Sequence, residues 1–276
     1  MRFIWQLLVV ALVSFVASVV LRAVQPYPWV TLVVGLLAAV GCVVAYRWVV
    51  RRTEHRVVDE LGRPGAVRGV AAGTLGGLVL FGSVVAGIAL LGGYHVSGLG
   101  SPAGAVGLLG FMAVVAASEE LLFRGVLFRH VERWFGTWIA LVSTGLIFGL
   151  VHLINPNANL WGAIAITMEA GGMLGAAYVA TRRLWVPIGL HLGWNVAASS
   201  IFSTEVSGNG TPQGMLDATT SGPVLLSGGA FGPEASLFSV VLCLVVAVGF
   251  LRVAARRGNL VPLRVPGRPA ADTLRG

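Results

Sequence analysis

Long apolar segments divide this chain and restrict it to one class of fold. A helix needs about 20 apolar residues to cross a bilayer core that is about 30 Å thick. A membrane β-barrel would instead show short segments of alternating hydropathy. Segments of the helical kind recur along the sequence at 3–22, 28–50, 69–93, 104–128, 137–154, 158–180, 185–202 and 235–253. The sequence therefore predicts an all-α, polytopic membrane helical bundle of about eight transmembrane helices.

The distribution of charge supports a membrane protein with both termini in the cytoplasm. Charged residues make up 11% of the chain, against about 25% in soluble domains. All 19 basic residues are arginines, and this topology places every one except Arg22 on the inner side, as the positive-inside rule requires. The net charge of +8 thus reflects contact with a lipid bilayer, and we expect no nucleic-acid partner. A composition rich in Arg, Ala, Val and Gly indicates a bacterial plasma membrane.

The order of the segments divides the chain into three parts. Residues 1–102 contain three N-terminal transmembrane helices, 103–202 form a core of four, and 203–276 hold the last one. Within these parts, the basic connector at 51–68 is expected to lie against the inner leaflet as an amphipathic segment. The Gly/Ser/Thr-rich segment at 203–234 is expected to be an external, mobile loop. The basic tail beyond Arg257 is expected to be disordered in the cytoplasm.

Two adjacent carboxylates in the fourth apolar segment are the strongest indication of function. An acid at the centre of a membrane helix costs roughly 2.5–3.5 kcal/mol, so it is expected to face the protein interior and to have a partner. Glu120 and Arg124 are four residues apart and can form an ion pair on one helical face. Glu119 is rotated by about 100° from Glu120, which leaves its carboxylate for a different site.

Two later segments carry imidazole and amide groups at helical spacing. His191 and Asn195 are four residues apart, as are Phe148 and His152, so that the phenyl ring packs beside the imidazole. Glu169 lies in the sixth segment, and no role is assigned to it. His95 and His130 lie at the ends of segments, where we expect them to be solvated. Both cysteines, Cys42 and Cys243, lie in apolar segments and are interpreted as packing residues.

Helix geometry allows these groups to meet. If the chain turns at Phe135-Gly136, Glu119 and His152 both stand about 24 Å from the turn, at a rise of 1.5 Å per residue. His191 enters from the same side and stands about 12 Å deep. The depths agree if the fourth helix projects about two turns beyond the membrane. We therefore expect a shared site in the cytoplasmic half of the membrane that opens toward the cytoplasmic leaflet.

The motif order resembles the CPBP family of intramembrane proteases, which includes type II CAAX prenyl endopeptidases and bacteriocin-processing proteins. The resemblance covers about 103–202. Three motifs match in order: Glu-Glu-x-x-x-Arg at Glu119, Glu120 and Arg124, Phe-x-x-x-His at Phe148 and His152, and His-x-x-x-Asn at His191 and Asn195. The flank Leu184-Trp185-Val186-Pro187 before His191 is also similar to the family.

The resemblance implies hydrolysis of a peptide bond by water. Glu119 would be the general base, and His152 would hold the water. His191 and Asn195 would donate to the developing oxyanion, a stabilisation often worth about 3–4 kcal/mol per donor. Glu120 and Arg124 would form a supporting ion pair, with Phe148 as a packing residue. The implied partner is a membrane-associated peptide or protein, of CAAX or bacteriocin-like type.

The cofactor and the function class stay open at this stage. Glu119, His152 and His191 are a candidate set of ligands for zinc, so the resemblance implies either a metallo-type hydrolase or a metal-free glutamic one. A proton- or ion-coupled transporter could use the same groups as a relay. A non-catalytic immunity or scaffold protein could retain the fold. Each of these residues could instead have a purely structural role. The two acids could form an ion-pair cluster with Arg124, His152 could be a hydrogen-bonded histidine of the core, and His191 and Asn195 could form hydrogen bonds between helices.

Overall fold

The computed structural model describes residues 1–210 and 213–263, and these residues form a helical membrane bundle. The first three helices are α1 (Arg2–Val24), α2 (Pro28–Glu54) and α3 (Ala66–Leu90). The next unit is continuous through α4 (Pro102–Glu120), the π-helical η2 (Leu121–Phe128) and α5 (Arg129–Phe135). It is followed by α6 (Thr137–Val151) and the 3₁₀ turn η3 (His152–Ile154).

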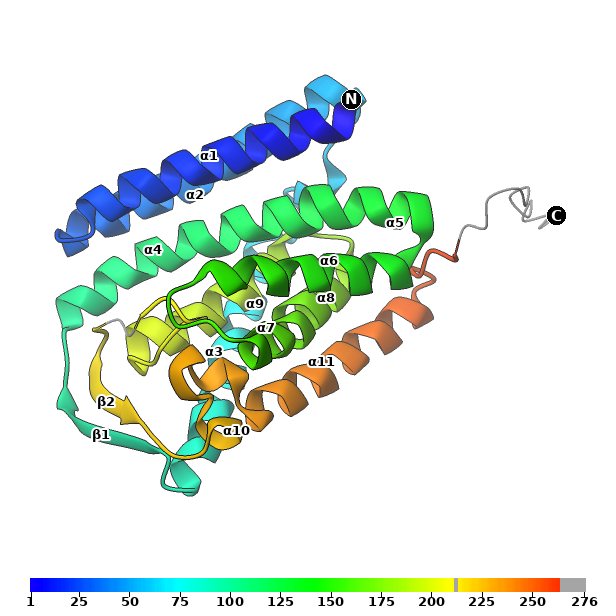
Figure 1. Ribbon diagram of the computed structural model, residues 1–276. Coiled ribbons are helices and arrows are strands. Elements are labelled where there is room, and N and C mark those ends of the chain that lie inside the picture. Colours follow the sequence, from blue (N-terminus) through cyan, green and yellow to red (C-terminus); the bar gives the residue numbers. More distant parts are fainter. Residues whose placement is uncertain (211–212, 264–276) are drawn as a thin grey trace.

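The remaining elements complete the bundle (Figure 1). A sixth membrane helix runs through α7 (Leu160–Ile166), the π-helical η4 (Thr167–Leu174) and α8 (Gly175–Thr181). It is followed by α9 (Trp185–Asn195) and the π-helical η5 (Val196–Ile201). The short α10 (Val224–Ser227) precedes α11 (Leu237–Arg256), and 3₁₀ turns form at η1 (Asp59–Leu61), η6 (Gly229–Phe231) and η7 (Pro233–Ala235).

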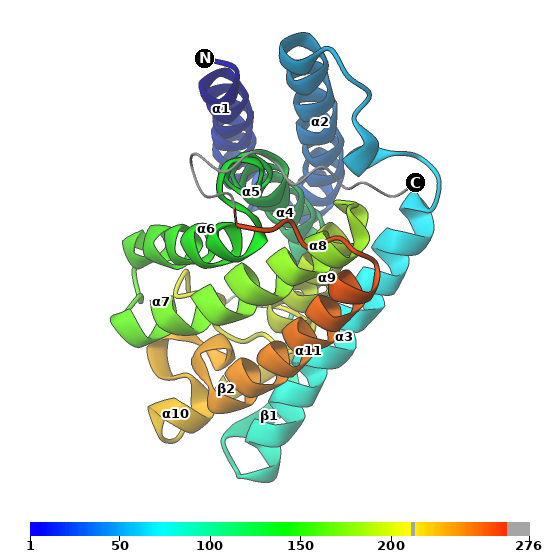
Figure 2. The ribbon, with the colours of Figure 1, turned by 90° about the vertical axis from the view of Figure 1, so that its right-hand side faces the viewer.

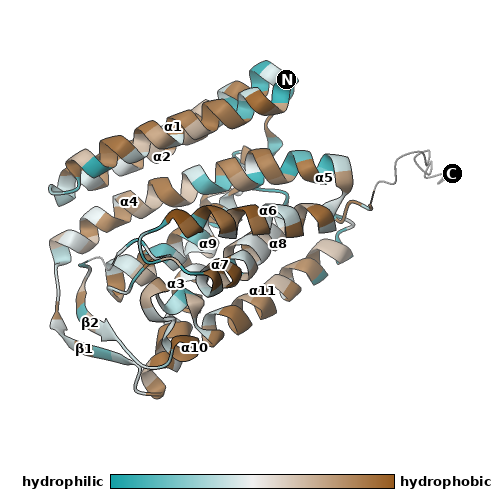
Figure 3. Cartoon of the chain, in the orientation of Figure 1, coloured by the Kyte–Doolittle hydropathy of each residue, from teal (hydrophilic) through white to brown (hydrophobic). Residues whose placement is uncertain are grey.

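Seven helices of the described residues are long and apolar enough to cross a membrane. The fold class is therefore as predicted, whereas the eighth segment at 185–202 differs. It forms α9 and η5, of 11 and 6 residues, and most of its side chains are buried. A helix enclosed by other helices does not need to match the full thickness of the bilayer, which explains its shortness. Figure 3 shows mostly hydrophobic positions along α1, α2 and α11, with hydrophilic positions on α5, at the ends of α1 and α2 and in the turns.

The bundle has two ends, which we name here because the site lies closer to one of them. The arginine end contains the start of α1, the connector at 55–65, the Phe135–Gly136 turn and the 182–184 turn. The hairpin end contains the α1–α2 turn, the 155–159 turn and the segment between η5 and α11. At the hairpin end β1 (Tyr94–Leu99) pairs antiparallel with β2 (Leu216–Thr220).

The helix that carries the two acids lies between the N-terminal pair and the rest of the bundle. In Figures 1 and 2, α1 and α2 lie on one side of α4, and α9 lies on the other. Close approach depends on glycines: a Cβ at Gly35 of α2 would lie 2.2 Å from the carbonyl oxygen of Gly110 of α4. The α3–α9 contact is equally tight, since a Cβ at Gly193 would lie 2.0 Å from the carbonyl oxygen of Thr74.

Part of the connector between α2 and α3 packs on the protein. Glu60 and Leu61 are buried, and the backbone oxygen of Glu60 accepts a hydrogen bond from the amide of Leu184. Contact of the remaining, exposed residues with the inner leaflet stays a prediction. The expected solvation of His130 is wrong, because its ring is buried 5.1 Å from the Phe3 ring.

The segment between η5 and α11 is buried at both of its ends. Val206, Ser207, Phe231 and Glu234 are buried, so these parts cover the hairpin end of the bundle, whereas most residues from 215 to 226 are exposed or half-buried. The prediction of an exposed loop is therefore wrong for the two ends, because small polar residues can satisfy their hydrogen bonds inside a fold as well as in water. Residues 211 and 212 of the predicted loop lie outside the described residues.

The start of the C-terminal tail is also ordered by contacts. Asn259 donates to the carbonyl oxygens of Val179 and Ala180, and Val261 pairs with Thr137. The rest of the expected disordered tail, 264–276, lies outside the described residues.

Candidate active site

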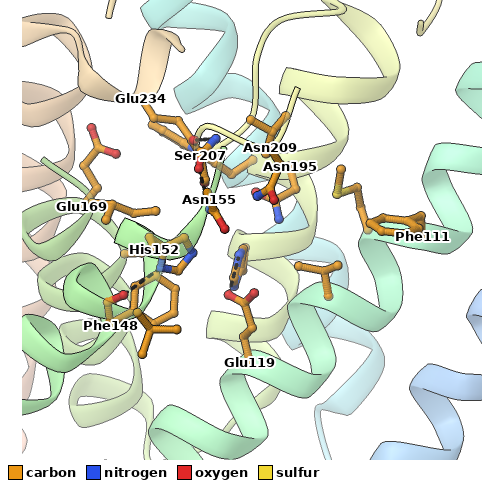
Figure 4. A pocket seen from close by; sticks show the side chains of 18 of the residues that line it. Phe111, Glu119, Phe148, His152, Asn155, Glu169, Asn195, Ser207, Asn209 and Glu234 are labelled. Atoms are coloured by element: carbon orange, nitrogen blue, oxygen red, sulfur yellow. Dashed lines mark hydrogen bonds and ion pairs between the residues drawn. The ribbon is translucent and has the colours of Figure 1, made fainter. Parts of the chain in front are cut away.

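A cavity of about 720 Å³ is lined by five of the seven residues of the three motifs. Glu119 of α4, His152 of η3 and Asn195 of α9 come from three separate helical units and point into it (Figure 4). His191 and Phe148 also line this cavity. The predicted meeting of these groups is thus observed.

Glu120 and Arg124 form the ion pair that their spacing predicted. Arg124 Nη1 donates to Glu120 Oε1 over 2.7 Å, and both side chains are buried. Arg124 Nη2 donates to the carbonyl oxygen of Ala170 in η4, and the guanidinium lies 5.1 Å from the centre of the Phe148 ring. One side chain thereby fixes α4, α6 and η4 relative to one another.

The imidazole of His191 links the two acids. Its Nδ1 lies 3.0 Å from Glu120 Oε1, and its Nε2 lies 3.8 Å from Glu119 Oε2. A carboxylate accepts hydrogen bonds, so Nδ1 carries the proton in this contact. The side chain of Glu119 retains about 30% exposure, whereas that of Glu120 has none. Glu119 is therefore the acid that meets the contents of the cavity.

His152 occupies a defined orientation at the end of α6. Its Nδ1 donates to the carbonyl oxygen of Phe148 over 2.7 Å, because a carbonyl only accepts. In the neutral ring this leaves the Nε2 lone pair on the side that faces the cavity (Figure 4). The Phe148 ring lies 4.6 Å from the imidazole, as the four-residue spacing predicted.

Asn195 and Glu119 lie on the two sides of the same space (Figure 4). The side chain of Asn195 is buried, and its amide makes no hydrogen bond to another described residue. Its polar atoms are nevertheless accessible from the cavity. An amide in this position can donate to a bound group.

Three π-helical segments adjoin the site residues, and none of them was predicted from the sequence. Glu119 and Glu120 come directly before η2, Asn195 directly before η5, and Glu169 lies within η4. A π-helical turn widens the helix by one residue and is often found at functional sites. Each π-helical turn therefore rotates the side chains that follow it relative to those that precede it.

Sequence reasoning missed Glu234, which lies at the polar wall of the cavity (Figure 4). Its carboxyl accepts hydrogen bonds from Trp194 Nε1 (2.9 Å) and from the amide and hydroxyl of Ser207. Burial raises the pKa of the Glu234 carboxyl, and these hydrogen bonds oppose the shift. It joins the segment after η5 to the helix that carries Asn195. No local pattern around Glu234 could have indicated this contact.

Glu169, left without a role above, lies in the same wall of the cavity. Its side chain is buried, and its Oε1 makes no hydrogen bond to another described residue.

The candidate zinc ligands do not surround a preformed metal centre. Among residues 1–210 and 213–263, no group of three His, Cys, Asp or Glu side chains is arranged to hold a metal ion. Nδ1 of His152 is directed to a backbone carbonyl and Nδ1 of His191 to Glu120, so Nε2 is the ring nitrogen of each that stays available to a bound group. Zinc requires its ligands within about 2.0–2.3 Å of one centre.

The cavity reaches the hairpin end of the bundle and not the arginine end. Its exposed lining residues are Ser18, Arg22 and Gln25 in and after the last turns of α1, Val151, Ile154 and Pro156 at and after the end of α6, and Asn209 and Gly210 after η5. Among the described residues, none of the lining side chains comes from the 55–65 connector or the 182–184 turn. The expectation of a site that opens on the side of the arginines is therefore wrong. Glu119 lies near the middle of the unit 102–135, and the turns that follow α6 and η5 leave the opening on the other side.

A comparison with protein families identifies the core of the chain. Residues 101–197 match the family model described as Type II CAAX prenyl endopeptidase Rce1-like. This central part is similar to that family. No curated protein and no solved structure matches the chain. The Rce1-like core contains all three motifs, from Glu119 to Asn195, and its family supports a protease that acts on a membrane-associated peptide.

Proposed function

We propose that this chain is an intramembrane endopeptidase in which Glu119 activates a water molecule for attack on a peptide bond. The observation that carries the proposal is the convergence of Glu119, His152, His191 and Asn195 on one cavity within an Rce1-like core. The substrate is a membrane-associated peptide or protein, of CAAX or bacteriocin-like type.

Glu119 has the position of a general base. Its carboxylate is partly exposed to the cavity and is held by no ion pair as close as that between Glu120 and Arg124. A water between Glu119 and His152 would give its proton to the carboxylate while the Nε2 lone pair of His152 holds the second hydrogen. The attacking oxygen would then face the scissile carbonyl.

Asn195 and His191 stabilise the negative charge that develops on the carbonyl oxygen. The amide group of Asn195 donates directly, and His191 donates from Nε2 in its imidazolium form, with Nδ1 held by Glu120. Glu119 then returns its proton to the leaving amine, which completes the hydrolysis with all atoms accounted for. Glu120, Arg124 and Phe148 position these groups and do not contact the substrate.

The family match favours a hydrolase over a transporter, because residues 101–197 match a model of peptidases. The polar groups surround a closed inner end at Glu119, which suits a reaction on a bound peptide.

The test is the substitution Glu119→Gln, which keeps the shape of the side chain and removes its basicity. We expect peptide cleavage by the purified protein to fall by about 10²–10⁴-fold, the usual contribution of a general base. The assay is mass spectrometry of a library of membrane-anchored peptides, with thermal unfolding as a measure of the fold. Asp217→Asn is the matched control, because Asp217 is an exposed acid on β2, and it should cleave as the wild type does. Equal product from the Glu119→Gln variant and the wild type would reject Glu119 as the base.

A further inference from the structure

The cavity opens at the end of the bundle opposite to most of the arginines. Six of its eight exposed lining residues lie at the hairpin end: Arg22, Gln25, Ile154, Pro156, Asn209 and Gly210. We call these six residues the mouth. Of the 16 arginines among the described residues, 14 lie in the segments of the arginine end or in the helical turns next to it; Arg22 lies at the hairpin end and Arg124 beside the site.

The orientation of a membrane protein follows its positively charged loops. Short loops rich in arginine stay in the cytoplasm, and the effect is strongest within about 15–20 residues of the membrane segments. Six arginines lie within 47–68 and two more at Arg182 and Arg183, next to the turns that join membrane helices. The arginine end is therefore the cytoplasmic end, and the hairpin end faces the opposite side of the membrane.

We infer that this site receives its substrate from the non-cytoplasmic side of the membrane. The inference rests on the proposed protease function, because only an enzyme has a substrate. The location of the mouth does not depend on the reaction. It narrows the substrate to peptides or protein segments that are exported or anchored in the outer leaflet. A lipidated C-terminus that stays on the cytoplasmic leaflet could not reach Glu119 through this mouth.

The walls of the cavity show what kind of peptide it fits. Leu108, Phe111 and Met112 of α4 form an apolar wall, and the opposite wall carries Asn155 and Ser207. Asn155 donates to the carbonyl oxygen of Ser207, which closes this polar wall over the site. The volume of about 720 Å³ is enough for a few residues of an extended chain. The cavity therefore fits a substrate peptide whose apolar side chains contact α4 and whose backbone contacts the polar wall.

The first test measures orientation and needs no activity. Cys42 and Cys243 are buried and are first replaced by alanine. Single cysteines are then placed at Asn209 in the mouth, at Leu225 elsewhere on the hairpin end, and at Val57 on the arginine end, all of which are exposed. A membrane-impermeant maleimide on intact cells should label N209C and L225C, and V57C only after permeabilisation. Labelling of V57C in intact cells, with or without the other two, would overturn the inference.

The second test asks whether the mouth is the entrance. Purified N209C that carries a bulky maleimide adduct should cleave the membrane-anchored peptides at least tenfold more slowly than the same variant without the adduct. L225C should be unaffected by its adduct, because Leu225 lies outside the cavity lining. Equal cleavage by modified and unmodified N209C would reject this entrance. That result would leave the proposed function intact, since the effect of Glu119→Gln is measured separately.

Discussion

Arg124 contacts three helical units through one guanidinium group that is only 2% exposed. It is paired with Glu120, bonded to the carbonyl oxygen of Ala170 and stacked near Phe148. A buried charge is tolerated only when its partner and hydrogen bonds are in place. Removal of the guanidinium would leave the carboxylate of Glu120 with His191 as its only partner among the described residues.

We expect Arg124→Met to lower the free energy of unfolding by about 3–5 kcal/mol, because it leaves a buried charge without its partner. Thermal and denaturant unfolding in detergent would measure the change. The double variant with Glu120→Gln should recover part of the loss, since the uncompensated charge is then absent. Arg68→Met removes an exposed arginine and is the matched control. A loss of stability as large in the control as in Arg124→Met would contradict the assigned role.

At the scale of elements, the approach of α3 to α9 determines where His191 and Asn195 lie. Gly73 and Gly77 of α3 face the backbone of α9, and Gly189 and Gly193 of α9 face the backbone of α3. Small residues allow such backbone contact between membrane helices, where packing is the main source of association. The helix that carries the proposed oxyanion donors therefore depends on the absence of side chains at these positions.

Gly193→Ala tests this packing. Its Cβ would lie 2.0 Å from the carbonyl oxygen of Thr74, so the two helices must separate. We expect a loss of at least 1–3 kcal/mol of stability, about the usual cost of overpacking, and lower cleavage activity because Asn195 shifts. Gly41→Ala is the matched control, since nothing lies within 4 Å of its added Cβ. If both variants unfold at the same temperature, the close approach does not set stability.

At the scale of the whole molecule, a polar cluster at the arginine end joins the N-terminal helices to the Rce1-like core. Arg129 of α5 donates to Glu54 of α2, and the hydroxyl of Tyr46 bonds to both Glu60 and the carbonyl oxygen of Gly125. The division of the chain into three parts stays a prediction, while these contacts show that the first part and the core share buried hydrogen bonds.

The cluster makes stability depend on pH through Glu60. Burial by itself would raise the pKa of the Glu60 carboxyl, but hydrogen bonds from Arg56 and Tyr46 outweigh it, so its pKa is lowered. A lowered pKa in the folded state adds stability above the unfolded value of about 4.3, and this stability is lost as the pH falls through the folded value. We expect Glu60→Gln to unfold at a lower temperature than the wild type at a pH of about 6.

The same difference should shrink as the pH is lowered below about 4, because the unfolded state then takes up a proton that the folded state, with its lowered pKa, does not. Thermal unfolding across this range measures it. Asp59→Asn, at the exposed neighbouring position, should keep the pH profile of the wild type. A gap between Glu60→Gln and the wild type that stays constant over the range would argue against this linkage.

Several features of the molecule followed from local sequence alone. The thickness of a bilayer sets the length of an apolar helix. Most ends of the membrane helices were therefore predicted to within a few residues. The α-helical repeat places residues four apart on one face, so the pairs of Glu120 with Arg124 and of Phe148 with His152 were predicted as well. The three motifs in order also indicated the family that the comparison supports over residues 101–197.

The tertiary structure decided the rest. The burial of Glu234 and Ser207, the carbonyl of Ala170 that Arg124 binds and the side on which the cavity opens all depend on contacts between residues far apart in the chain. Hydropathy and helical spacing describe one segment at a time, so they contain no information on which neighbouring segment covers a polar group. The sequence by itself thus determined the helices and the chemical groups, whereas packing decided their partners and the direction of access, because burial is a property of several segments together.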